Sequence, residues 1–114
     1  MNDSGMVRTV HQDSSVLVLA LSGQINMRVS PNLLGQMEPM VREGPERLVI
    51  DLSEVLFMDS SGVGALVHLF RLMKNRKGSF ALAGPNERVR GLFKITRLDT
   101  LFAIHDTLDE AIKP

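Results

Sequence analysis

Residues 48–64, LVIDLSEVLFMDSSGVG, decide how this chain is organised. The apolar start is short and rich in β-branched residues, which is typical of a strand covered on both faces, so we expect a strand over residues 47–52. Apolar residues then recur at helical spacing, and they predict a helix from residue 61 to about residue 77. Its inward stripe is expected to be Val63, Leu66, Val67, Phe70 and Met73. The turn between them, DSSG at residues 59–62, lies where α/β folds place ligand chemistry and is the first candidate site.

Strands and helices alternate along the rest of the chain. Two strands, over residues 6–11 and 16–21, form an N-terminal hairpin. Helices are expected over residues 30–42, 87–95 and 107–112, and strands over residues 80–83 and 101–104. Ser30 before Pro31 is predicted to cap the first of these helices, Pro39 to kink it, and Thr107 to cap the last. The order β-β-α-β-α-β-α-β-α predicts an α/β fold with about four helices and a mixed, mostly parallel sheet, whose antiparallel edge is the hairpin.

Length and composition exclude several classes of protein. A chain of 114 residues suits one hydrophobic core, so we expect a single domain over residues 1–114, with residues 1–5 frayed. A net charge of zero argues against a nucleic-acid surface, the lack of Cys excludes thiolate sites, and no residues are spaced as metal ligands. No stretch approaches the ~20 apolar residues of a membrane span, and no signal-peptide core is seen. The expected location is the cytoplasm, without direct insertion into a membrane.

The serine pair at the turn allows more than one interpretation. A hydrolase nucleophile elbow needs a glycine two residues before the serine, but Met58 and Asp59 hold those positions. Gly62 and Gly64 lack the third glycine of a dinucleotide loop, so they would serve a close approach, either to a neighbouring strand or to the backbone of a partner. The remaining interpretations are a cap for the helix or a phosphoacceptor, because a phosphate at a helix N-terminus meets unpaired N–H groups.

Two segments, VIDL at residues 49–52 and FMDSSGVG at residues 57–64, resemble the signature of STAS domains, specifically of the bacterial anti-sigma factor antagonists. The resemblance covers nearly the whole chain and implies the STAS fold, with four helices against a mixed sheet. It implies a protein–protein switch without catalysis or cofactor of its own. The first serine after the aspartate is the phosphoacceptor in this family, which is Ser60 here. The residues around it would be Asp59, Ser61, Gly62, Gly64 and Asn26.

The resemblance also implies partners. In this family the unmodified antagonist binds an anti-sigma factor that is also a serine kinase of the histidine-kinase-like ATPase fold, and this frees a sigma factor for transcription. Phosphorylation releases the antagonist, and a serine phosphatase reverses the modification. Leu69 and Leu72, beside the core stripe of the helix, are expected to be exposed anchors. The residues expected to contact the partner are Gly23, Gln24, Asn26, Met58, Ser60, Ser61, Val63, Leu69 and Leu72.

Two positions depart from the family pattern. Family members commonly carry Gly-Glu-Leu-Asp after the second strand, whereas residues 23–26 read GQIN here, so Gln24 and Asn26 bring amides in place of carboxylates. This departure keeps a second function open, a STAS scaffold subunit of a lipid-transport or stress-signalling complex that is not phosphorylated. Arg97 stands where a glycine is frequent, which is expected to alter the exit of the helix before it.

Overall fold

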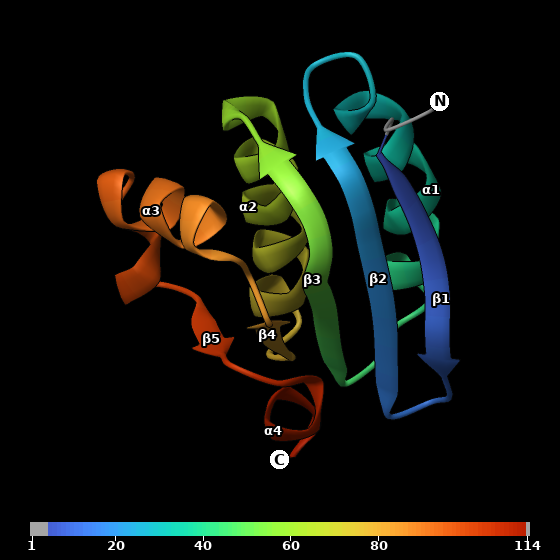
Figure 1. Cartoon of the computed structure of the whole chain (residues 1–114). Helices are drawn as coiled ribbons and strands as arrows, with labels where there is room; N and C mark the ends of the chain where they lie inside the picture. The colour runs from blue at the N-terminus through green and yellow to red at the C-terminus, as the bar shows by residue number, and fades with distance from the viewer. Residues whose placement is uncertain (1–4, 114) are drawn as a thin grey trace.

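Five strands and four α-helices make up residues 5–113, the part of the chain that the computed structural model describes (Figure 1). They follow in the order β1 (Met6–Gln12), β2 (Val16–Ile25), α1 (Ser30–Arg42), β3 (Arg47–Met58), α2 (Ser60–Asn75), β4 (Ser79–Ala83), α3 (Glu87–Ile95), β5 (Ala103–His105) and α4 (Leu108–Ile112), with a short 3-10 helix, Leu98–Thr100, before β5. The predicted order of elements is therefore confirmed. The expected fraying of residues 1–4 falls outside the described residues, and Gly5 is half-buried.

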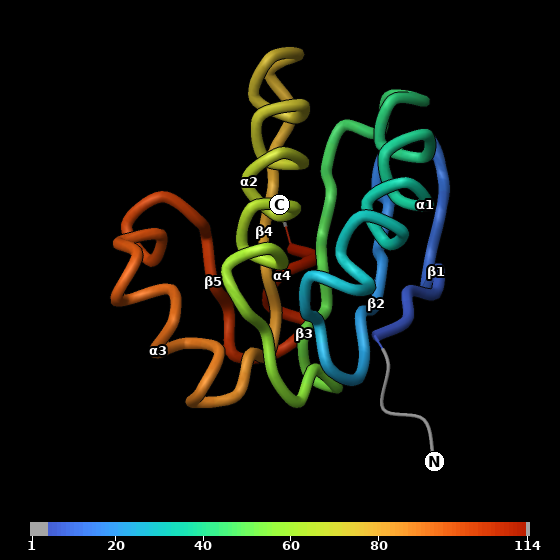
Figure 2. Tube along the Cα trace, turned by 90° about the horizontal axis from the view of Figure 1, so that it is seen from above, coloured from blue at the N-terminus to red at the C-terminus, as the bar shows by residue number. Residues whose placement is uncertain are grey.

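The strands form one sheet in the order β1-β2-β3-β4-β5. β1 runs antiparallel to β2, and the other neighbours are parallel. This confirms the predicted mixed, mostly parallel sheet with an antiparallel edge hairpin. α1 and α2 lie side by side over one face of the sheet, while α4 covers part of the other (Figures 1 and 2). None of the helices within residues 5–113 is long and apolar enough to span a bilayer.

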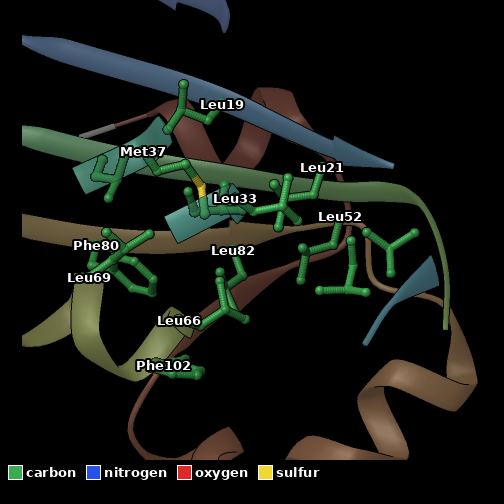
Figure 3. Packing of buried hydrophobic residues seen from close by; sticks show 14 of the residues in the cluster. Leu19, Leu21, Leu33, Met37, Leu52, Leu66, Leu69, Phe80, Leu82 and Phe102 are labelled. Atoms are coloured by element: carbon green, nitrogen blue, oxygen red, sulfur yellow. The ribbon is translucent and has the colours of Figure 1, made fainter. Parts of the chain in front are cut away.

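Side chains of the parallel strands alternate between two apolar layers, because successive residues of a strand point to opposite faces. One layer is large and joins the sheet to α1 and α2 (Figure 3). Its members include Leu19, Leu52, Phe80, Leu82, Leu33, Met37, Leu66 and Leu69. The other layer is small and joins Val18, Val49, Ala81 and Ala83 to Ala111 of α4. Small side chains on this second face allow the short α4 to pack close to the sheet.

β2 and β3 are longer than predicted. The sequence placed their ends near residues 21 and 52, where polar residues begin, but parallel pairing continues to Ile25 and Met58. The register shifts twice over this extension, between Ala20 and Ser22 and between Gly23 and Gln24. Exposed residues 53, 54, 56 and 57 interrupt the alternation of β3, which is why its pattern ended early in the sequence.

The start of α1 differs from the prediction. Val29 holds the N-cap position without a side-chain cap, and Ser30 is a buried residue of the first turn. The helix continues through Pro39 to Arg42. Both Pro39 and Gly35, whose carbonyl loses its helical donor there, are exposed. Water can therefore satisfy that carbonyl.

The buried face of α2 is rotated relative to the predicted stripe. Gly62, Leu66, Leu69 and Met73 face the sheet, whereas Val67 and Phe70 are only partly buried at the edge of the core. The prediction of Leu69 as an exposed anchor is therefore wrong, because its side chain is 0% exposed and lies in the core layer with Phe80 (Figure 3).

Candidate functional site

The DSSG turn lies at the carboxyl ends of β2 and β3, beside the connection from β2 to α1 (Figure 1). The N–H of Asp59 donates to the carbonyl of Ile25 at 3.0 Å, which ties the end of β3 to the end of β2. Two crossover connections therefore meet at the turn, as expected for ligand or partner chemistry on a parallel sheet.

Asp59 is the N-cap of α2, and its two carboxylate oxygens have different partners. Oδ1 accepts from the backbone N–H of Ser61 at 2.8 Å and from the Ser61 hydroxyl at 2.5 Å. Oδ2 accepts from the backbone N–H of Met27 at 3.2 Å, in the loop between β2 and α1. The hydrogen bond from the Ser61 side chain, with the backbone N–H donors, lowers the pKa of Asp59. One ionised carboxylate thus holds both the helix start and the neighbouring loop.

The two serines of the turn differ in their surroundings. Ser61 is half-buried, and its hydroxyl also lies 2.9 Å from the hydroxyl of Ser30 in α1. Ser60 is the first residue of α2 and is exposed. The hydroxyl of Ser61 therefore contacts both Asp59 and Ser30, whereas Ser60 is an exposed residue.

The two glycines after the serines also differ. A Cβ on Gly62 would lie 2.6 Å from Cγ of Met58 and 2.9 Å from Cγ2 of Ile25, so this glycine lets α2 approach the strand ends. A Cβ on Gly64 would meet no heavy atom within 4 Å. Gly64 lines an open groove of about 330 Å³ between α1 and α2. The sequence left two roles open for these glycines, a close approach to a neighbouring strand or to the backbone of a partner. Gly62 has the first role, whereas the position of a Cβ on Gly64 is open space.

Three predicted site residues, Gly23, Gln24 and Asn26, lie at or just after the end of β2. Gly23 is half-buried with a φ of +79°, a conformation that favours glycine, and Gln24 is exposed. The side-chain oxygen of Asn26 accepts from the backbone N–H of Arg28 at 3.0 Å. The Asn26 side chain therefore stabilises its own loop, and neither serine is its partner in that hydrogen bond.

The apolar residues predicted to touch a partner are largely internal. Met58 and Val63 are buried in the same core layer as Leu69. Leu72 is partly buried and packs against that layer. These side chains support the turn from inside, so they offer little surface to a partner.

Sequence reasoning missed Ser30 and Met27 as neighbours of the turn. Ser30 precedes Pro31, which favoured the cap interpretation, and nothing local in the sequence relates it to Ser61, 31 residues away. Met27 takes part through its backbone N–H, which any residue other than proline could supply. Among residues 5–113, no group of three or more His, Cys, Asp or Glu side chains could hold a metal ion.

Comparison with known proteins places this fold and turn in a family. The STAS domain model matches residues 8–111, and the chain belongs to the STAS domain family. It is 33% identical over 95 residues to the anti-sigma-B factor antagonist of Bacillus subtilis, covering 83% of this chain and 86% of that protein. It is likewise similar to the crystal structure of an anti-sigma factor antagonist from Mycobacterium paratuberculosis, with a TM-score of 0.88, 30% identity, and coverage of 98% and 94%.

A more distant structure has the same fold. The Bacillus cell fate determinant SpoIIAA in its phosphorylated form aligns with a TM-score of 0.74 and 20% identity, covering 94% of this chain and 96% of that one. At this identity the likeness bears on the fold alone.

Proposed function

We propose that this chain is an anti-sigma factor antagonist whose binding to an anti-sigma factor is controlled by phosphorylation of Ser60. The observation that carries the proposal is the difference between the two serines of the turn. Ser60 is exposed at the start of α2, whereas the Ser61 hydroxyl is bonded to Asp59 and adjoins Ser30. A kinase can therefore reach the oxygen of Ser60 without breaking an internal hydrogen bond of Ser61.

The modification would be carried out by the partner. An anti-sigma factor with the histidine-kinase-like ATPase fold would transfer the γ-phosphoryl group of ATP to Oγ of Ser60. The new O–P bond replaces the bond between the β and γ phosphates, ADP leaves, and the serine proton passes to a base of the kinase. A serine phosphatase would return Ser60 by hydrolysis. This chain supplies the acceptor and no catalytic group, and it would act in the cytoplasm.

Phosphorylation at this position is compatible with the fold. The phosphate would sit at the N-terminus of a 16-residue helix, where the dipole favours negative charge. It would add about −1.5 to −2 charges next to the ionised Asp59 on an exposed surface. The cost of desolvating the phosphate would then oppose docking of the partner.

Mass spectrometry tests the proposal directly. The purified chain is incubated with Mg-ATP and, in turn, with each histidine-kinase-like anti-sigma factor encoded in its source genome. We expect one phosphate on Ser60 in the wild type and none in Ser60→Ala. No phosphate with any of these proteins, or phosphate on Ser61, would overturn the proposal. A complete lack of phosphate and of binding would favour the scaffold alternative instead.

A further inference from the structure

The neutral total charge hides an uneven distribution of charge along the chain. Residues 60–98 contain eight Lys or Arg residues and one acidic residue, Glu87, whereas the rest of the chain contains five Lys or Arg and twelve Asp or Glu residues. The segment from α2 through β4 and α3 is therefore strongly basic, with a formal net charge of +7 against −7 elsewhere. Such a segment favours an anionic partner, although the whole chain is neutral.

Four of these cations belong to α3 and the residues just after it. Arg90 is paired with Asp106, with 2.6 Å between Nη2 and Oδ1. Arg88, Lys94 and Arg97 are exposed, and none of the ion pairs within residues 5–113 involves them. These three cations are therefore available to an anionic surface.

Two large apolar side chains are exposed beside these cations. Ile95, the last residue of α3, is 82% exposed, and Leu101, just after the 3-10 helix, is 48% exposed. The end of α3 and the segment after it form the outermost part of their side of the molecule (Figures 1 and 2). Residues 94–101, here called the α3 tip, thus combine exposed aliphatic and basic side chains on a projecting part of the fold.

Internal packing holds the α3 tip in place. Phe93 precedes the tip and Phe102 follows it, and their ring centroids lie 5.8 Å apart. These two side chains are 0% and 4% exposed. The N–H of Phe102 also donates to the carbonyl of Leu98 at 2.8 Å. The aromatic side chains at the base of the tip are therefore internal, and its exposed apolar surface is aliphatic.

Arg97 occupies a backbone conformation that does not suit its side chain. Its φ of +62° lies in the left-handed region, which glycine adopts without strain. Strained residues of this kind cluster at functional sites. A role for the cation at the surface of the tip, where Asp99 is the one acidic residue, would explain why an arginine stands there at a cost to the fold.

We propose that the α3 tip binds the surface of an anionic lipid bilayer. Ile95 and Leu101 would enter the headgroup layer, and the exposed cations Arg88, Lys94 and Arg97 would contact lipid phosphates. Binding of this kind adds buried apolar area to the attraction of Lys and Arg for anionic lipids. The bilayer is contacted at its surface and is not crossed. The inference goes beyond the proposed function and does not depend on it.

The shape and composition of the α3 tip favour a bilayer over another macromolecule. A single-stranded nucleic acid would stack its bases on aromatic side chains, but Phe93 and Phe102 are internal. A protein partner would need a hollow that fits a projecting tip, and about 800 Å² from each side for a stable interface. A bilayer needs neither, because each buried methylene group and each cation near its surface adds to binding separately.

Vesicle co-sedimentation of the full chain tests the inference. Vesicles of phosphatidylglycerol and phosphatidylcholine in equal parts are compared with vesicles of phosphatidylcholine alone, at low and at high salt. We expect the wild type to bind the anionic vesicles at low salt, and to lose binding at high salt or without phosphatidylglycerol. A wild type that does not bind the anionic vesicles at low salt would overturn the inference.

Two variants of the tip are each compared with a matched control. Arg97→Gln is paired with Lys77→Gln, because Lys77 is also exposed and has a φ of +62°, but follows the end of α2 that lies away from the tip (Figures 1 and 2). Ile95→Ser is paired with Met6→Ser, at a side chain 63% exposed on β1. We expect each tip variant to lower the partition coefficient about fivefold or more, and each control to lower it less than about twofold. Circular dichroism melting checks that every variant keeps the fold.

The same measurements separate the bilayer from other anionic partners. If Ile95→Ser binds the vesicles as the wild type does, charge alone is responsible and the inference is overturned. Stronger binding to polyglutamate or to DNA than to the vesicles would assign the tip to an acidic protein or a nucleic acid, and would also overturn it. None of these outcomes bears on the phosphorylation of Ser60, so the inference and the proposed function can fail separately.

Discussion

The hydroxyl of Ser61 lies 2.5 Å from Oδ1 of Asp59, and the same carboxylate oxygen accepts the backbone N–H of Ser61. Together with the contact to Ser30, this pair fastens the start of α2 to α1. The residue that the proposal treats as the phosphoacceptor is therefore the serine that the fold does not use.

This division of roles predicts unequal effects of two alanine substitutions. Ser61→Ala removes a charge-assisted hydrogen bond and leaves the buried Ser30 hydroxyl without its neighbour, so we expect a loss of about 1–3 kcal/mol in the free energy of unfolding. Ser60→Ala alters an exposed side chain and should stay within about 0.5 kcal/mol of wild type. Urea unfolding of the two variants measures both values. Equal losses would contradict the assignment of roles.

Asp59 predicts a specific pH dependence. Its pKa in the fold lies below the ordinary value of 3.8, so its contribution to stability is complete above that value and is lost as pH falls through the lower, folded pKa. Asp59→Asn should therefore be less stable than wild type at pH 7, with the gap closing below about pH 4. Asp13, whose pKa is lowered to about 2 chiefly by the N–H of Val16, titrates in both proteins and cancels in the comparison. A gap that stays constant from pH 7 to pH 2 would contradict the account.

Gly62 and Gly64 predict changes of opposite sign. Gly62→Ala forces a methyl group against Met58 and Ile25 and should cost about 1–3 kcal/mol. Gly64→Ala places a methyl group in open space inside a helix and should stabilise by about 0.5–1 kcal/mol. Thermal melting of the pair checks the prediction. A destabilising Gly64→Ala would show that the groove beside it is closed in solution.

Arg97 adopts a left-handed conformation, with a φ of +62°, just after α3. A residue with a Cβ pays about 1–2 kcal/mol in the folded state for this conformation, which glycine adopts without strain. Glycine loses about 0.5–1 kcal/mol more chain entropy on folding, which offsets part of that gain. Arg97→Gly should therefore stabilise the fold by about 0.5–1 kcal/mol. Lys94→Gly, inside α3, should instead destabilise by a similar amount. Chemical unfolding of both variants tests the assignment. Equal destabilisation by the two would contradict it.

Much of the fold followed from local patterns. The short apolar runs at residues 17–19 and 48–50 and the helical periods are strong, and they place the strands and helices in the right order. The buried face of α2 was misjudged because it begins at Gly62, which has no side chain to mark it. The ends of β2 and β3 were missed because polar residues there are accommodated by register shifts, which depend on the partner strand.

The DSSG turn was also found from sequence, since a strand running into a capped helix leaves a local signature. The neighbours of the turn were not found. Ser30 and Met27 reach it from more than 30 positions away along the chain. Contacts of this kind are set by the packing of whole elements, which a single sequence does not encode locally.

The most direct test of the central claim compares partner binding before and after modification of a single oxygen. The chain is phosphorylated fully on Ser60, and its Kd for the anti-sigma factor is measured by calorimetry beside that of the unmodified chain. We predict that the phosphate weakens binding about tenfold or more, equivalent to about 1.4 kcal/mol, while the melting temperature changes little. Equal affinity of the two forms would contradict the account, as would unfolding of the phosphorylated chain.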